Sequence, residues 1–115
     1  MIEYVLKKVK PFSDDREIIA FEILSPFEDL SIIQGISNIE DLDYFIEWLE
    51  ELKHRNIPDY SELGAILYQG ILWGSVKSKI VDLLDNGQYI EKQEFSTNDL
   101  IKLCMEWKKF IEIEK

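Results

Sequence analysis

Two side chains in the sequence could serve as a nucleophile and its base, and the chain has one of each. His54 and Cys104 are the single histidine and the single cysteine among the 115 residues. A catalytic cysteine needs a neighbouring base and an electropositive, partly exposed setting. His54 instead follows a polar helical segment, where a cation offsets the helix dipole, and Cys104 lies in an apolar stripe that favours a packed thiol. We therefore expect neither residue to be catalytic, and the chain not to be an enzyme.

Adjacent carboxylates are the second feature that could do chemistry, because such groups can bind a hard cation. The pairs are Asp14/Asp15, Glu28/Asp29, Glu40/Asp41 and Glu50/Glu51. None has the spacing of the twelve-residue calcium loop, and neighbours in sequence do not face one another on a helix. One cysteine and one histidine cannot supply the four ligands of a structural zinc site. We expect no metal and no cofactor, and an enzyme that uses carboxylates with a divalent ion stays open as an alternative.

The acidic residues are concentrated in one third of the chain. Residues 14–52 hold twelve acidic side chains and one basic side chain, a net charge of −11, whereas the remaining residues carry +1. The whole chain has a net charge of −10 and an isoelectric point near 4.5. Such a field attracts cationic partners and opposes binding to nucleic acid or to an anionic membrane surface. We expect a protein partner, with no nucleic acid and no membrane involved.

The sequence also indicates the cellular compartment of the protein. The longest stretch without a charged side chain, residues 63–76, has 14 residues and is too short to cross about 30 Å of hydrocarbon. The first residues lack the ordered regions of a secretory signal, and a single cysteine is typical of a reducing environment. We therefore expect a cytoplasmic protein.

A helix beginning after Asn38 is expected to carry most of this charge. Its apolar residues recur at steps of three and four, as on one face of a helix. They are Ile39, Leu42, Phe45, Ile46, Leu49 and Leu52. Asp41, Tyr44, Trp48 and Glu51 follow one another at steps of three, four and three on another side. Together with Glu47 they form what we call the acidic ridge.

The acidic ridge is predicted to bind a partner. Exposed aromatic side chains act as anchors on association, and flanking carboxylates steer and pair with Arg or Lys of a basic partner. An auxiliary set, which we call the acidic rim, consists of Asp14, Asp15, Glu28 and Asp29. The alternative interpretation is an ordinary solvated acidic helix, in which Tyr44 and Trp48 cover the edge of the core.

The elements that must position this helix predict a single α+β domain over residues 1–115. Residues 2–9 and 17–24 have the alternation and the β-branched residues of two strands, and residues 11–16 would connect them as an antiparallel hairpin. Pro26 ends the second strand, and residues 31–36 would add a short third strand or a turn.

The centre of the chain is ambiguous between helix and strand. After Pro58, a second helix would carry the apolar residues and two glycines of residues 63–74 on one stripe, although residues 65–73 could instead form a buried strand. Helix is the favoured interpretation. A further helix is predicted over residues 75–85, and residues 89–95 would return as an edge strand, a candidate to join the N-terminal sheet.

The C-terminal helix has the sharpest local signal. Ser96 and Asp99 form a variant of the capping box, and Phe95 and Leu100 occupy the positions of a hydrophobic staple, so the helix should begin at Thr97. Its buried stripe consists of Leu100, Leu103, Cys104, Trp107 and Ile111. The predicted fold is therefore α+β, with a small antiparallel N-terminal sheet packed against three or four helices.

These features together resemble a known class. A small acidic domain with an N-terminal hairpin, no catalytic set and a capped C-terminal helix ending in Trp107-Lys-Lys-Phe110-Ile111 resembles bacterial immunity proteins of polymorphic toxin systems, including those of contact-dependent growth inhibition. The resemblance implies noncovalent, stoichiometric inhibition of a cognate toxin domain. Such toxins are often basic nucleases, and an acidic inhibitor would occupy the charge environment meant for phosphate. The main alternative is a structural or regulatory subunit that dimerises through Tyr44 and Trp48.

Overall fold

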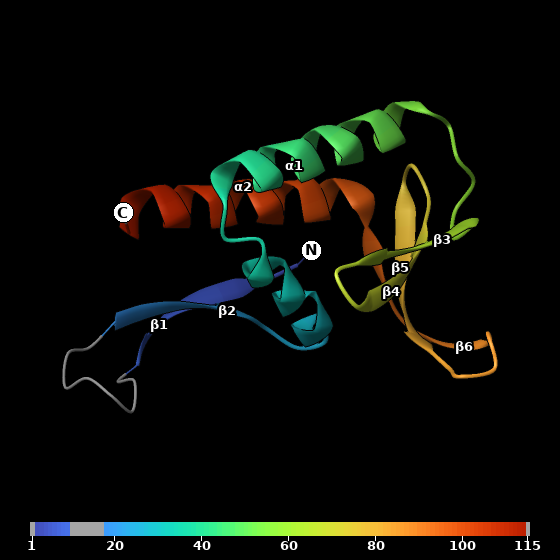
Figure 1. The fold of residues 1–115 in the computed structure, drawn as a ribbon, viewed down its shortest axis with the longest axis horizontal. Helices are drawn as coiled ribbons and strands as arrows, with labels where there is room; N and C mark the ends of the chain where they lie inside the picture. Colours follow the sequence, from blue (N-terminus) through green and yellow to red (C-terminus); the bar gives the residue numbers. More distant parts are fainter. Residues whose placement is uncertain (1, 10–17, 115) are drawn as a thin grey trace.

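The computed structural model describes residues 2–9 and 18–114. They form two antiparallel sheets, a 3-10 helix and two α-helices (Figure 1). Along the chain these are β1 (Tyr4–Val9), β2 (Ile18–Ile23), the 3-10 helix η1 (Glu28–Gly35), α1 (Ile39–His54), β3 (Glu62–Ile66), β4 (Gln69–Trp73), β5 (Lys77–Leu83), β6 (Tyr89–Ser96) and α2 (Thr97–Glu114). The α+β class is as predicted, with three helices and two sheets in the described part of the chain.

The N-terminal hairpin is confirmed. β1 and β2 pair antiparallel, with Tyr4 opposite Ile23. Phe21 of β2 is buried, and its ring lies 5.5 Å from that of Trp107 and 6.0 Å from that of Phe110. The Tyr4 hydroxyl donates to Glu106 over 3.0 Å. The hairpin therefore packs against the second half of α2, while the predicted connector, residues 11–16, lies outside the described residues.

The helix predicted over residues 63–74 is wrong, because these residues form most of β3 and β4. The two strands pair antiparallel from Glu62 opposite Trp73 to Ile66 opposite Gln69. The turn between them also interrupts the single buried strand that was the alternative. Glycine is needed at Gly70 because a Cβ there would lie 2.9 Å from Leu83 Cγ. Gly70 and Gly74, which the predicted helix would carry on its apolar stripe, instead make close contacts in and beside a sheet.

The helix predicted over residues 75–85 is also wrong, since β5 occupies this segment. β5 pairs with β4 on one side and with β6 on the other, which completes a four-stranded sheet in the order β3-β4-β5-β6. β6 is an edge strand, as predicted. It joins this sheet and not the N-terminal hairpin, so the chain has two sheets where one was expected.

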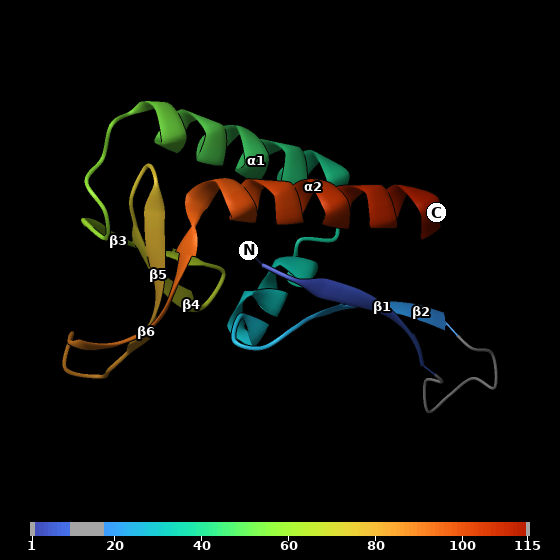
Figure 2. The ribbon, with the colours of Figure 1, turned by 180° about the vertical axis from the view of Figure 1, so that it is seen from behind.

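The 3-10 helix η1 replaces the predicted third strand or turn at residues 31–36. It contacts β2 and β4 and lies between the two sheets (Figures 1 and 2). Leu30 and Ile33 are fully buried there. Just after η1, the carbonyl of Ile36 accepts a 3.0 Å hydrogen bond from Nε1 of Trp107. This contact joins the segment between η1 and α1 to α2.

Helices α1 and α2 lie side by side and run antiparallel (Figures 1 and 2). Lys53, near the end of α1, donates over 2.9 Å to Asn98 at the start of α2. Near the other end, Lys108 pairs with Asp43 at 2.6 Å. The predicted start of α1 after Asn38 is confirmed, and the Asn38 side chain caps the helix by accepting from the N–H of Glu40 over 2.8 Å.

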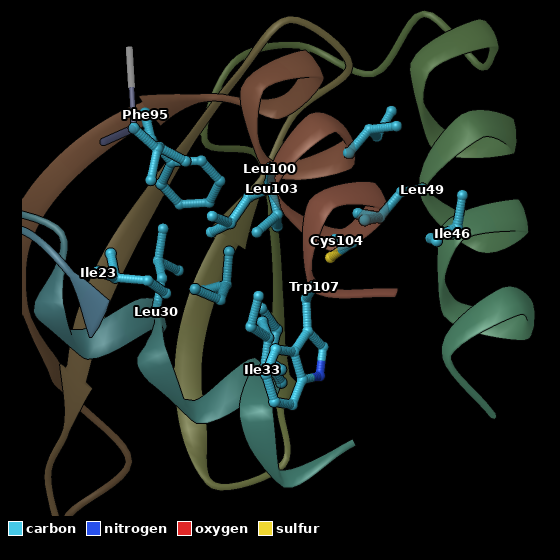
Figure 3. Close-up of a cluster of buried hydrophobic side chains, with 14 of the residues drawn as sticks. Ile23, Leu30, Ile33, Ile46, Leu49, Phe95, Leu100, Leu103, Cys104 and Trp107 are labelled. Atoms are coloured by element: carbon cyan, nitrogen blue, oxygen red, sulfur yellow. The ribbon is translucent and has the colours of Figure 1, made fainter. Parts of the chain in front are cut away.

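The predicted start of α2 at Thr97 is confirmed, and its apolar stripe lies at the centre of the core (Figure 3). The Ser96 hydroxyl accepts from the N–H of Asp99 over 3.4 Å, as a capping box requires. Cys104 is fully buried, and burial raises the pKa of its thiol to about 12. The cysteine is therefore protonated at neutral pH and acts as a packing group.

A buried network of hydroxyl groups fixes α1 to the large sheet. The Ser75 hydroxyl donates to the carbonyl of Leu52 over 2.6 Å and accepts from the N–H of Ile57 over 2.7 Å. The Thr97 hydroxyl donates over 2.7 Å to the carbonyl of Gly74. Because these bonds join the end of α1, the β4–β5 turn and the start of α2, they set the position of the outer face of α1.

Candidate protein-interaction surface

The acidic ridge lies on α1, and four of its five side chains face solvent. Asp41, Glu47 and Glu51 are exposed, and the side chain of Tyr44 is 73% exposed. Trp48 is different, because its half-buried ring meets that of Trp73 edge-on at 5.1 Å. Trp48 thus covers the edge of the core, as the alternative interpretation had it, and Tyr44 is the exposed aromatic residue of the ridge.

The carboxylates of the acidic ridge have no cationic partner among the described residues. No ion pair within 4.0 Å joins Asp41, Glu47 or Glu51 to a cation of residues 2–9 and 18–114. The nearby cations have other partners, since Arg55 pairs with Glu62 at 3.8 Å and Lys108 pairs with Asp43. Within the described part of the chain, these three carboxylates of α1 are therefore not neutralised by a cation.

The acidic rim is described only in part. Glu28 is exposed at the start of η1. Asp29 pairs with Lys92 of β6, and this hydrogen bond is the largest cause that raises the pKa of the lysine. The charge of Asp29 is therefore offset, whereas Glu28 forms no ion pair with a cation of the described residues. Asp14 and Asp15 lie outside the described residues.

Two apolar residues at the β3–β4 turn escaped the sequence analysis. Leu67 is 57% exposed and Tyr68 is 84% exposed. Leu67 has a φ of +53°, a conformation that a leucine rarely adopts. It rests on the backbone at Gly35, where a Cβ would lie 2.7 Å from Leu67 Cδ1. Strained residues often lie at sites of function, and exposed apolar groups mark interaction surfaces.

The same end of the sheet carries further exposed apolar residues on β5, β6 and the turn between them. They are Leu83, Leu84, Tyr89 and Ile90. This turn contains Asn86 and Gly87, with Gly87 at a φ of +81°. Asn-Gly between two segments rich in apolar residues is a strong hairpin signal. The helix predicted over residues 75–85 ends just before this pair, whereas as a hairpin signal the pair predicts β5 and β6.

Two neighbouring depressions connect these features. One, of about 450 Å³, is lined by Asp41 and Tyr44 of α1 and by Leu67 of the turn, among others. The second, of about 340 Å³, is lined by Glu28, Asp29, Leu67 and Tyr68, among others. Leu67 lines both. The fold therefore brings the first half of the acidic ridge, the β3–β4 turn and the described part of the acidic rim together on one surface.

The second half of the acidic ridge borders a separate hollow. A shallow depression of about 500 Å³ is lined by Glu47, Glu50, Glu51, His54 and Arg55. Within the described ranges, no group of three or more His, Cys, Asp or Glu side chains is arranged to hold a metal ion. None of the helices described has the length and apolar character needed to cross a membrane.

Comparison with known proteins gives no relative: no family model, no curated protein and no solved structure matches the chain.

Proposed function

We propose that this protein is an immunity protein, which binds a basic bacterial toxin domain one to one in the cytoplasm and inhibits it without covalent chemistry. The observation that carries the proposal is the exposed outer face of α1, whose carboxylates have no partner among the described cations. Such a face offers preformed partners to Arg and Lys side chains and raises the rate of encounter with a cationic protein.

The arrangement of these carboxylates is unfavourable in the free protein. Glu47 has like-charged neighbours at Glu50 and Glu51, three and four residues further along α1. Like charges at these spacings destabilise a helix by about 0.2–0.5 kcal/mol per pair. A cationic partner would relieve this repulsion, so the partner would gain binding energy from charges that do not stabilise the fold.

The surface also contains the apolar groups that a stable complex requires. Charge pairs at the rim of an interface mainly set the rate and specificity of binding, whereas buried aromatic and apolar anchors supply most of the energy. Tyr44, Leu67 and Tyr68 provide such anchors beside the acidic ridge. Covering the phosphate-binding surface of a basic nuclease would then block its substrate.

The test begins with the upstream reading frame, which we expect to encode a large secreted protein with a variable, basic C-terminal domain. That domain is purified, the stoichiometry and affinity of its complex are measured by calorimetry, and its rate of association is measured by stopped-flow mixing at increasing salt. We expect a one-to-one complex whose association slows as salt rises. The double reversal Glu47→Lys with Glu51→Lys should weaken binding by at least about tenfold, the equivalent of about 1.4 kcal/mol.

The matched control is the double reversal Glu3→Lys with Glu112→Lys, which changes the net charge equally. Both residues are exposed. Glu3 lies just before β1 and Glu112 lies on α2, both outside the proposed interface. Equal losses of affinity in the two double variants would show a general effect of net charge and would refute the role of the acidic ridge. An adjacent operon of metabolic enzymes would refute the immunity function itself.

A further inference from the structure

We propose that the depression between α1 and the β3–β4 turn receives an arginine side chain of the partner protein. This inference rests on the proposed function for the identity of the partner, and it names the chemical group that this surface recognises. The depression has a volume of about 450 Å³ and is lined by residues of α1, the segment before it, and β3 with its turn.

The wall formed by apolar residues suits the stem of a long side chain. Ile66 is buried, Phe45 is half-buried, and Leu67 is largely exposed on the side of the turn. Arg and Lys bury their methylene stems along such apolar surfaces and keep the charged group at the polar edge. A purely apolar side chain would fill the same space but would leave the carboxylate of Asp41 desolvated beside it.

The polar edge of the depression carries a carboxylate and an exposed aromatic ring. Asp41 has no cationic partner among the described residues, and Tyr44 is 73% exposed. A guanidinium can pair with a carboxylate through two parallel hydrogen bonds and can stack on an aromatic face. The ammonium of lysine is compact and strongly hydrated, so it gains less from the ring. The combination therefore favours arginine over lysine.

The other charges around the depression do not oppose a cation. None of the described residues that line it has a cationic side chain. The positive end of the α1 dipole lies nearby at Asn38, but Glu40 in the first turn offsets it and leaves Asp41 for the arginine. The Asn38 side chain is already engaged as the cap of the helix.

The shape of the depression is set before any partner arrives. Leu67 holds its positive φ between β3 and β4, and its side chain rests at Gly35. The variant Gly35→Ala would place a Cβ 2.7 Å from Leu67 Cδ1 and so displace the leucine without changing any charge. A preformed site loses less entropy on binding, which increases affinity.

The first experiment uses the isotopically labelled full chain and three short peptides, in which glycine flanks arginine, lysine or citrulline. Citrulline has nearly the shape of arginine without its charge. Nuclear magnetic resonance spectra should show shifts at the amides of residues 41, 44 and 65–67 on addition of the arginine peptide. We expect the lysine peptide to bind at least about threefold more weakly and the citrulline peptide to leave the spectrum unchanged.

Two variants test whether the Asp41 carboxylate binds the arginine side chain. Asp41→Asn should weaken binding of the arginine peptide by at least about fivefold, whereas Asp85→Asn, an exposed aspartate elsewhere, should not change it. Equal responses to arginine and lysine, or shifts confined to the second half of the acidic ridge, would show general attraction of cations and overturn the proposal. Binding of citrulline as tightly as arginine would overturn it too.

The inference and the proposed function can fail separately. If the toxin domain binds but Asp41→Asn and Tyr44→Ala leave its affinity unchanged, the arginine site is refuted while the immunity function stands. If the arginine peptide binds as described but no toxin domain does, the site stands and the immunity function fails. Ile113→Ala, which removes an exposed apolar side chain of α2 outside the proposed interface, is the control for Tyr44→Ala, and thermal unfolding verifies that each variant is folded.

Discussion

If the acidic ridge exists for binding, removing its charge should stabilise the free protein. Glu47 is exposed in the middle of α1, so a substitution there changes charge without disturbing the core or the helix ends. Its like-charged neighbours are Glu50 and Glu51. Asp43 is also four residues away, but its pairing with Lys108 at 2.6 Å offsets its charge. We therefore count two repulsive pairs.

The expected size of the effect follows from these two pairs. Each pair costs about 0.2–0.5 kcal/mol, so Glu47→Gln should raise the free energy of unfolding by about 0.4–1 kcal/mol. Glu47→Lys converts both repulsions into attractions and should raise it by about 0.8–2 kcal/mol. With an unfolding entropy of about 2.1 cal/mol/K per residue, 1 kcal/mol corresponds to about 4 °C in Tm for a chain of this length.

Urea denaturation at low salt and in 1 M NaCl measures this effect. At 1 M salt the screening length falls to about 3 Å, so both gains should largely disappear. Glu3→Lys is the control, because it changes the net charge equally on an exposed residue outside any helix. The reasoning is refuted if Glu47→Lys is no more stable than the parent at low salt, if its gain persists in 1 M NaCl, or if Glu3→Lys gains as much.

Three further predictions concern the core that positions the surface. Trp107→Phe removes the donor to the carbonyl of Ile36 and should lower the free energy of unfolding, measured in urea, by about 1–3 kcal/mol. Most of this loss should come from the unsatisfied acceptor, and an unchanged free energy of unfolding would refute the importance of the hydrogen bond. Gly74→Ala places a Cβ 2.4 Å from the carbonyl oxygen of Lys77, so we expect a fall in Tm of more than about 8 °C, whereas an unchanged Tm would refute the crowding. Because burial raises the pKa of Cys104 to about 12, the thiol should resist Ellman's reagent at pH 8 until urea unfolds the chain; rapid reaction of the native protein would contradict its burial.

The parts of the fold that the sequence predicts well are those set by neighbouring residues. The start of α2 depends on Ser96 and Asp99, three positions apart, and the start of α1 on the Asn38 cap. Their apolar stripes repeat over three turns or more, long enough for the helical period to be distinctive. The hairpin of β1 and β2 also follows from local alternation and a short connector.

The four-stranded sheet could not be predicted in the same way, because its pairing is not local. In residues 63–74 the apolar residues match steps of three and four over so short a run that a helix and two strands fit equally well. What decides between them is β5, which pairs with β4 and itself depends on the Asn86-Gly87 turn. A helix over residues 75–85, as predicted from the sequence, leaves β4 without a partner strand.

The interaction surface depends both on local helical spacing and on the non-local pairing of the sheet. This determines which variants can test it. Helical spacing places Tyr44 and Trp48 on the same ridge, but only the sheet determines that Trp73 of β4 covers Trp48 and that Leu67 lies near Tyr44. Removing a well-packed tryptophan costs up to about 3–5 kcal/mol, so a loss of binding in Trp48→Ala would not distinguish a lost contact from a lost fold. Tyr44→Ala changes an exposed ring, and a loss of affinity at unchanged Tm would therefore report the contact itself.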